Sequence, residues 1–445
     1  MSILENPIVK HKRNISPIAI IGALFFIFGF VTWLNSVLIP YLEIACELNK
    51  FQSYFVTFAF YMAYLIMAPL STATLRRFGF KNGMGVGLLI MAFGALLFIP
   101  AALSRTYFLF LTGLFIMGSG LAILQTASNP YITIVGPIES AVKRMSIMGI
   151  CNKLAGALAP IMLGLFLKLD DTDHLLARIN SLSATARAAA LDEMAIRVIP
   201  PYIAIIVVLL VLAYLIFKSG LPEIDTNAED DHAAVQAVGK KSVFQFPHVI
   251  LGVFTLFLYV GVEVMAGDTI ISYGLSQGIP FATAKLFTTG TLVAMVIGYI
   301  IGTFAVPRYI SQQNVLKVSA LLGLVLTISA VFAEGYLSVG SVALLGLANS
   351  LMWPAIWPLT LAGLGRYTKA ASSLLIMGIS GGAIIPLIYG ATIDHQVQQS
   401  MSAGVAKVMA TADASQQAYL IMLPCYLVIF YYAVKGHRLG RETKG

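Results

Sequence analysis

Nine polar or charged side chains stand inside long apolar runs of this sequence, where such groups need partners. The uncharged set consists of Asn35, Ser36, Gln125, Asn129, Asn152 and Asn349. The charged set consists of Lys153, Glu263 and Asp268. Amides offer both donors and acceptors, which suits a ligand rich in hydroxyl groups. For each single amide, the alternative is a hydrogen bond that holds two helices together.

The spacing of these residues predicts which of them share a helix face. Gln125 and Asn129 are four residues apart, so they lie on one face. Asn349, Trp353 and Trp357 follow at intervals of four, which predicts one amide and two indoles along one side of a helix. A sugar would suit this stripe, because its hydroxyl groups bind amides and its apolar face packs on aromatic rings. The alternative is that either tryptophan only packs or anchors the helix at a membrane interface.

The elements that must position these residues are membrane helices. The chain has 445 residues, of which 58% are hydrophobic and 11% charged, and its mean hydropathy is +0.86. A soluble domain carries about 25% charged residues, and a membrane span needs roughly 20 apolar ones. Twelve such segments begin near residues 16, 51, 83, 107, 144, 197, 247, 282, 314, 337, 369 and 417. The sequence therefore predicts an all-α membrane protein with twelve transmembrane helices.

The chain divides into two halves. A polar stretch of mixed charge separates a six-helix bundle over residues 1–217 from a second over 247–445, with a linker at 218–246. Long loops follow the fifth and eleventh spans, and prolines interrupt the fourth and tenth, at Pro130 and at Pro354 and Pro358. These matches predict two bundles related by a pseudo-two-fold axis. Broken spans at matching positions indicate a substrate site, because freed backbone groups need protein or a wet cavity.

The charged residues within the spans carry the most information. A charge at mid-membrane costs about 2.5 to 3.5 kcal/mol, so we expect Lys153, Glu263 and Asp268 to face a cavity and to pair or stay neutral. Glu263 and Asp268 are about 140° apart on an ideal helix. Both can face one cavity only if the stretch YVGVEVMAGD is distorted. The alternative is an ion pair that only locks the two halves together.

The net charge of +8 has a topological explanation. Of the 28 Lys and Arg residues, nineteen lie on the cytoplasmic side if the N-terminus does, eight lie outside and Lys153 lies in a span. This positive-inside bias places both termini in the cytoplasm, and no nucleic-acid partner is expected. The three cysteines show no paired spacing, and the acidic stretch at 170–174 is expected to be a solvated loop. We expect neither a metal nor a cofactor.

Four stretches resemble one known family, the fucose, galactose and glucose proton symporters of the major facilitator superfamily. They are FFIFGFVTWLNSVLIPYL, QTASNPYITIVGP, YVGVEV and the segment from NSLMWPAIWP to IYGATID. The resemblance covers nearly the whole chain. It implies alternating access and proton-driven uptake of a monosaccharide by a monomer in a bacterial inner membrane.

The departures from the family narrow the expected substrate and coupling residues. Family members usually have an aspartate, thought to take part in coupling, where this chain has Ser36. The fucose branch has a glutamate in place of Gln125, whereas the glucose and galactose branch has glutamine there and a glutamate matching Glu263. Lys153, Asp268 and WPAIWP look most like N-acetylglucosamine permeases. We therefore expect N-acetylglucosamine or a neutral hexose such as glucose or galactose as the substrate.

The predicted site is assigned in two sets. The substrate-binding set is Asn35, Gln125, Asn129, Asn152, Glu263, Asn349, Trp353 and Trp357, and Trp33 is a further candidate for an apolar face. The proton-coupling set is Lys153, Glu263 and Asp268. Sodium coupling, or a facilitator or exporter on the same fold, remains the alternative. An enzyme is not expected, because no nucleophile with a partner base is evident and the six histidines lack ligand spacing.

Overall fold

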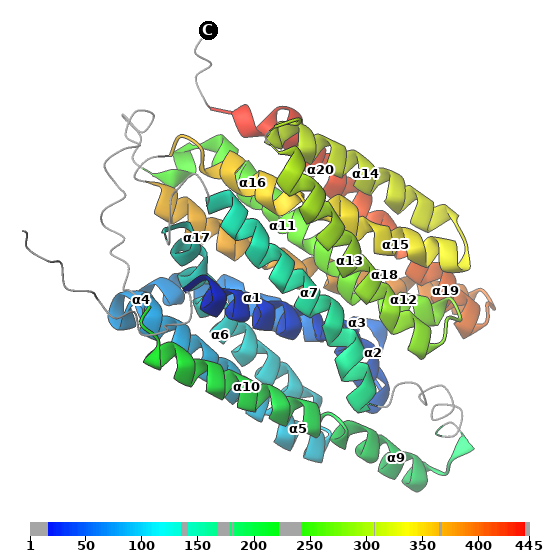
Figure 1. The fold of residues 1–445 in the computed structure, drawn as a ribbon. Helices are drawn as coiled ribbons and strands as arrows, with labels where there is room; N and C mark the ends of the chain where they lie inside the picture. The colour runs from blue at the N-terminus through cyan, green and yellow to red at the C-terminus, as the bar shows by residue number, and fades with distance from the viewer. Residues whose placement is uncertain are drawn as a thin grey trace, which may run out of the picture.

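The computed structural model describes residues 17–134, 141–167, 179, 181–221, 242–306, 308–364 and 367–440. Every regular element in this part of the chain is a helix. Twelve stretches of it are long and apolar enough to cross a membrane, which confirms the predicted number. Figure 1 shows two groups of helices, the first half of the chain in blue to green and the second in green to red.

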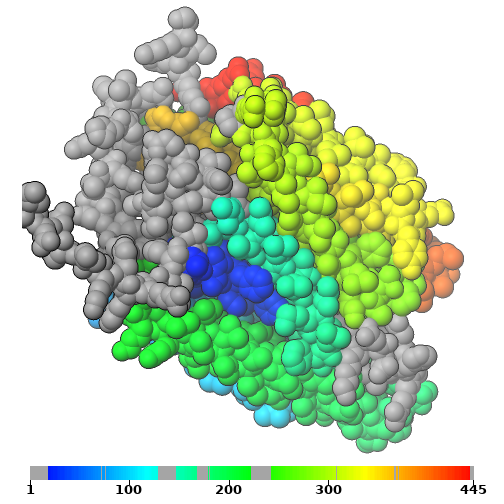
Figure 2. Space-filling view, viewed as in Figure 1, coloured from blue at the N-terminus to red at the C-terminus, as the bar shows by residue number. Residues whose placement is uncertain are grey.

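The N-terminal bundle contains nine helices in the described residues. They are α1 (Pro17–Trp33), α2 (Asn35–Ala45), α3 (Lys50–Ser53), α4 (Phe55–Leu96), α5 (Phe98–Ser104), α6 (Tyr107–Ile134), α7 (Ala141–Leu167), α9 (Ala184–Ile196) and α10 (Ile199–Lys218). Helix α4 carries most of both the second and the third span, and its backbone leaves the helical range at Gly79 (φ 76°, ψ 172°). On the face drawn in Figure 2, α1 lies exposed between α7 and α10.

The C-terminal bundle contains ten α-helices in the described residues. They are α11 (Pro247–Asp268), α12 (Ile270–Ser276), α13 (Phe281–Ala305), α14 (Gln312–Phe332), α15 (Gly335–Asn349), α16 (Met352–Leu361), α17 (Thr368–Gly378), α18 (Gly381–Ser402), α19 (Lys407–Gln417) and α20 (Met422–Val434). Single 3-10 turns occupy Val243–Gln245, Ala418–Ile421 and Gly436–Arg438.

The helix breaks lie at other positions than the prolines predicted. Pro130 lies within α6, which continues to Ile134, so the predicted interruption of the fourth span is wrong. The tenth span is interrupted, but at residues 350–351, ahead of Pro354. Pro354 then occupies the first turn of α16, where a backbone N–H has no partner within the helix and proline is tolerated. The first span breaks at Leu34, and the seventh breaks at Thr269.

The two halves meet along several helices. Helix α7 packs on α13, α4 packs on α17 and α18, and α2 packs on α11 and α12. Near the end of the molecule away from the C-terminus, the Asp394 carboxylate of α18 accepts a hydrogen bond from the Phe51 backbone N–H in α3, at 2.9 Å. The rings of Tyr54 and Tyr389 meet edge to face there, with centroids 5.6 Å apart. Contacts between the halves therefore close this end.

Some predicted features lie outside the described residues. They include most of the linker, at 222–241, and the acidic stretch at 170–174. Asn129 lies within α6, but its side chain is also outside the part that the structure describes.

Candidate functional site

A buried ion pair joins the two halves of the molecule. Lys153 comes from α7 and Glu263 from α11, and Nζ lies 2.6 Å from Oε1. Each residue is only 8% exposed. The Lys153 ammonium also lies 4.8 Å from the centre of the Trp33 ring, in cation–π geometry. The charges are thus compensated in three ways, by opposite charge, by a short hydrogen bond and by an aromatic face.

Trp33 is held between the two halves as well. A Cβ atom on Gly156 of α7 or on Gly267 of α11 would overlap the indole ring. The ring fits only because both positions are glycine, and it is 2% exposed. Since Gly267 directly precedes Asp268, Trp33 reaches from the ion pair to the end of α11. Its indole N–H has no hydrogen-bond partner among the described residues.

Asp268 differs from Glu263 in having no hydrogen-bond partner among the described residues. It is the last residue of α11 and is fully buried, and neither carboxylate oxygen accepts a hydrogen bond within the described residues. Helix α11 stays regular to its end and the break comes at Thr269, so YVGVEVMAGD lacks the distortion that Glu263 and Asp268 would need to face one cavity. An ionised carboxylate without a partner costs several kcal/mol in apolar surroundings. The proton content of Asp268 therefore strongly affects the energy of this conformation.

Two of the predicted amides are held within the N-terminal half. The Gln125 amide nitrogen donates to the Tyr64 hydroxyl at 3.2 Å, which links α6 to α4. The Asn152 amide nitrogen donates to the Phe25 carbonyl oxygen at 3.3 Å, which links α7 to α1. Both amides are partly buried. The Asn152 contact has the form expected of an amide that holds two helices together.

The other two described amides keep polar atoms without a partner. Asn35 is fully buried at the start of α2, and neither its amide oxygen nor its nitrogen has a partner in the described residues. The Asn349 oxygen accepts from the Tyr426 hydroxyl at 2.9 Å, whereas its nitrogen has no partner there. Buried polar groups are rarely left unsatisfied. These atoms are therefore candidates for contacts with a ligand.

The predicted stripe of one amide and two indoles is divided. Asn349 ends α15, whereas Trp353 and Trp357 lie in α16, so the prediction of one continuous helix face is wrong. The two indoles stack with centroids 5.2 Å apart and planes 24° apart. Trp353 also lies 6.4 Å from the ring of Tyr259 in α11. The indoles are half-buried, so their faces remain available for an apolar ligand surface.

Sequence analysis missed the tyrosines of the site. Tyr64 holds Gln125, Tyr426 holds Asn349, and Tyr259 contacts Trp353. In the second span, Tyr61 and Tyr64 stand three residues apart, so they lie on one helix face. That spacing was the available signal. Tyrosine also belongs to ordinary apolar packing, so this spacing alone does not assign the two residues to a site.

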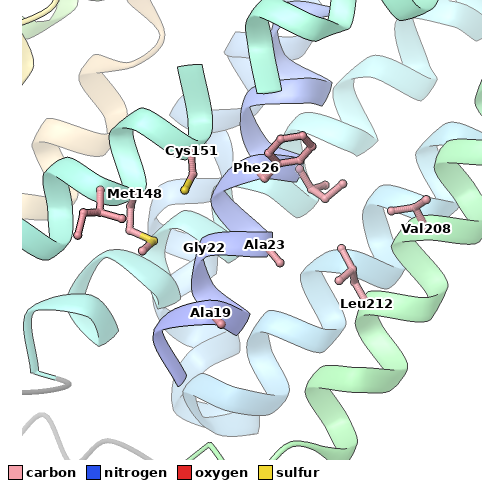
Figure 3. A pocket seen from close by; sticks show the side chains of 10 residues that line it. Ala19, Gly22, Ala23, Phe26, Met148, Cys151, Val208 and Leu212 are labelled. Carbon is pink, nitrogen blue, oxygen red and sulfur yellow. The ribbon is translucent and has the colours of Figure 1, made fainter. Parts of the chain in front are cut away.

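An apolar pocket opens elsewhere, between α1, α7 and α10. It has a volume of about 620 Å³, and Figure 3 shows Phe26, Met148, Cys151 and Leu212 among the side chains that line it. Phe26 is 39% exposed, so the pocket lies at the surface. No amide or charged group is among its ten lining residues. It cannot offer a sugar the hydrogen bonds that the interface between the halves can.

Comparisons with known proteins identify the family and the fold. Residues 21–387 match the Major Facilitator Superfamily. The chain is 34% identical over 422 residues to a glucose/galactose transporter of Brucella abortus, covering 93% of this chain and 92% of that protein. It is 30% identical to the L-fucose-proton symporter of Escherichia coli, covering 95% and 94%. A crystal structure of the Escherichia coli fucose:proton symporter matches with a TM-score of 0.67 at 29% identity, covering 94% and 97%.

Proposed function

The chain belongs to the major facilitator superfamily, and we propose that it is a secondary active transporter that imports a neutral monosaccharide together with a proton. Its relatives are transporters, and the chain is not an enzyme. The observation that carries the proposal is the Lys153–Glu263 ion pair. It lies between two bundles that must part and close again if a substrate is to pass between them.

Alternating access follows from the contacts between the halves. In this conformation Asp394 and Tyr389 of one half hold Phe51 and Tyr54 of the other, which closes the end away from the C-terminus. Opening that end requires these contacts to separate, while the opposite end closes. A substrate that fits between the halves in both conformations is carried across by this movement.

The sugar is assigned to the interface near Asn35 and Gln125 of the first half and Asn349 of the second. The unpartnered atoms of Asn35 and Asn349 would be satisfied by sugar hydroxyl groups. Trp353 and Trp357 would cover an apolar face of the sugar ring. Asn129, Asn152 and Glu263 complete the proposed substrate-binding set. The expected substrate is N-acetylglucosamine or a neutral hexose such as glucose or galactose.

Proton coupling is assigned to Lys153, Glu263 and Asp268. A proton on Glu263 would remove the charge that Lys153 balances and so weaken a link between the halves. A proton on Asp268 would remove an unpaired charge from a fully buried position. Either step changes the relative energy of the two conformations. A ligand or proton shifts such an equilibrium only through its different affinity for the two states.

Two measurements on the purified protein test this function. A thermal-shift screen against N-acetylglucosamine, glucose, galactose, mannose and fucose identifies the sugar, because a ligand that binds only the folded state raises the melting temperature. Uptake into proteoliposomes is then driven by an imposed pH gradient or, in a parallel experiment, by a sodium gradient. We expect accumulation with the pH gradient alone. Accumulation with sodium alone, or mere equilibration under both gradients, would contradict proton symport.

The proposed setting is a bacterial inner membrane, with both termini in the cytoplasm and the protein acting as a monomer. The positive-inside bias of the sequence supports this orientation. The exposed apolar side chains around the pocket of Figure 3 are suited to contact with lipid chains.

A further inference from the structure

The Lys153 ammonium has one partner in each half of the molecule. Glu263 of α11 lies in the other half, with its Oε1 atom 2.6 Å from Nζ. Trp33, the last residue of α1, belongs to the same half as Lys153, and its ring centre lies 4.8 Å from Nζ. The first contact joins two charges, whereas the second places a cation over the electron-rich face of a neutral ring. The contact with Trp33 therefore does not depend on the protonation of a carboxylate.

Helices α1 and α7 are fastened together beside Lys153. The Asn152 amide nitrogen donates to the Phe25 carbonyl oxygen at 3.3 Å. A Cβ atom on Gly29 would overlap the Asn152 carbonyl oxygen, so the backbones of the two helices are in direct contact. Both contacts lie next to the ammonium-bearing residue, because Asn152 directly precedes Lys153. A movement of one half against the other therefore separates the ion pair but carries Trp33 along with the ammonium.

The indole lies beside the ion pair on both α7 and α11. Gly156 follows Lys153 by three residues and so shares its face of α7. Gly267 follows Glu263 by four residues and so shares its face of α11. A Cβ atom on Gly156 would overlap Cδ1 of the indole, and one on Gly267 would overlap Cζ3. When the halves part, the Cζ3 edge of Trp33 loses its neighbour in α11, whereas the Cδ1 edge keeps its neighbour in α7.

A proton on Glu263 leaves the ammonium without its counter-charge. Among the described residues, Glu263 is the only acid in an ion pair with Lys153. Further titratable groups that interact electrostatically with Glu263 are Asp268 and the tyrosines Tyr61, Tyr259, Tyr299 and Tyr426. Tyrosine hydroxyls are neutral at physiological pH, and a lone cation is costly in the membrane interior. The Trp33 ring is then the contact that still stabilises Lys153.

We propose that Trp33 is a positioning residue for proton coupling, because its ring holds the Lys153 ammonium while Glu263 carries the proton and the halves part. This inference rests on the proposed function. One O–H bond forms on Glu263 and no N–H bond of Lys153 breaks, so the pair gains one proton. Without the ring, the loaded protein must move with a bare cation in the membrane interior or lose a proton from that cation. Either course slows the movement of the proton-loaded protein.

The test measures counterflow exchange of labelled sugar by the full-length protein in proteoliposomes. Exchange requires the loaded protein to open alternately at both ends, without net flow of protons. The labelled sugar is the one that raises the melting temperature of the wild type most. Trp33→Leu removes the aromatic face, and we expect exchange about tenfold slower than in the wild type. Trp33→Phe keeps a smaller aromatic face and should recover exchange to within about threefold of the wild type.

A background without the ion pair separates the role of the ring from packing. The double variant Lys153→Met with Glu263→Gln has no cation beside the indole. Adding Trp33→Leu to this background should slow exchange by less than about twofold. A tenfold loss there as well would show that Trp33 contributes packing alone, and the inference would be wrong.

Phe28→Leu provides a matched control within α1. Phe28 is fully buried, and no cation of the described residues lies over its ring. We expect exchange within about twofold of the wild type. The melting temperature of each variant shows that folded protein is compared. If Trp33→Leu does not fold, the same comparison of the two backgrounds is made with Trp33→Phe, whose smaller loss should likewise vanish when the ion pair is absent.

The outcomes also distinguish this inference from the proposed function. If the wild type accumulates sugar in a pH gradient while Trp33→Leu causes equal losses in both backgrounds, the inference is wrong and proton symport stands. If Trp33→Leu exchanges sugar as fast as the wild type, the inference is wrong for the same reason. If the wild type exchanges sugar but a pH gradient drives no accumulation, proton symport is wrong and the inference fails with it.

Discussion

Two buried carboxylates lie five residues apart on α11, and their surroundings differ. Glu263 forms an ion pair with Lys153 at 2.6 Å, beside the Trp33 ring. Asp268, at the end of the same helix, is fully buried and has no hydrogen-bond partner in the described residues. One charge is compensated by the other half of the molecule, and the other charge is not compensated by any described group.

The difference separates two ways in which a buried acid can respond to a proton. Protonating Glu263 breaks an existing bond between the halves, so its effect depends on Lys153. Protonating Asp268 breaks no bond and only removes an uncompensated charge, whose burial is costly. Glu263 thus contributes an ion pair between the halves, whereas Asp268 forms none with the described residues, so the proposed coupling roles of the two acids can be tested separately.

Lys153→Met tests the ion pair between Lys153 and Glu263 and has the largest expected effect on stability. It leaves the Glu263 carboxylate buried without its cation, which should lower the free energy of unfolding by about 3 to 5 kcal/mol. Denaturation of the purified protein in detergent measures this loss. The double variant Lys153→Met with Glu263→Gln removes both charges and should recover most of the stability. Equal losses in the single and double variants would show that the ion pair does not govern cohesion.

Trp33→Phe weakens the same pair without removing a charge. The smaller ring leaves a cavity between Gly156 and Gly267 and weakens the cation–π contact with Lys153, so we expect a loss of about 2 kcal/mol. The matched control is Trp357→Phe, because Trp357 is half-buried and no cation of the described residues lies over its ring. The same denaturation measurement should give less than about 1 kcal/mol for this control. Equal losses of stability in the two variants would show that Trp33 contributes only ordinary packing.

Asp268→Asn tests the role of the carboxylate that has no hydrogen-bond partner among the described residues. The change removes no ion pair and takes away the charge of a buried carboxylate, so the free energy of unfolding should not fall by more than about 1 kcal/mol below the wild type. Coupling should be lost. A gradient of one pH unit supplies about 1.4 kcal/mol per proton, which allows the wild type about tenfold accumulation of sugar if one proton accompanies each sugar. In Asp268→Asn the sugar should only reach equal concentrations on the two sides of the membrane. Uptake of labelled sugar into proteoliposomes measures the ratio, while counterflow exchange should persist. Undiminished accumulation would remove Asp268 from the coupling set.

Most of the fold could be predicted because hydropathy alone determines where a chain can cross a membrane. Twelve apolar segments predicted twelve spans, and twelve are found in the described residues. The breaks were less predictable. Pro130 suggested an interruption that α6 does not have, whereas the first span breaks at Leu34 without a proline there. A proline only removes one donor, and its surroundings decide whether the helix continues.

The charged part of the site was predicted better than its polar part. Unpaired charges are so costly in a membrane that Lys153 had to find a carboxylate, and it pairs with Glu263. Nothing comparable determines the partner of an amide. Asn349 was expected beside Trp353, yet it bonds to Tyr426 of α20, because the intervening break turns it away. The sequence also could not show that Asp268 has no partner among the described residues, since pairing depends on where helix ends meet.

Ser36→Ala has the smallest expected effect and tests whether coupling extends beyond α7 and α11. Ser36 is fully buried, and its hydroxyl donates to the Trp33 carbonyl oxygen at 2.8 Å. Losing this bond should cost about 0.5 to 1 kcal/mol in the free energy of unfolding. The pH dependence of uptake should not change, because a hydroxyl does not titrate in the physiological range. A shifted pH profile would mean that this position, where related symporters usually have an aspartate, still influences a titrating group. Coupling could then not be assigned to Lys153, Glu263 and Asp268 alone.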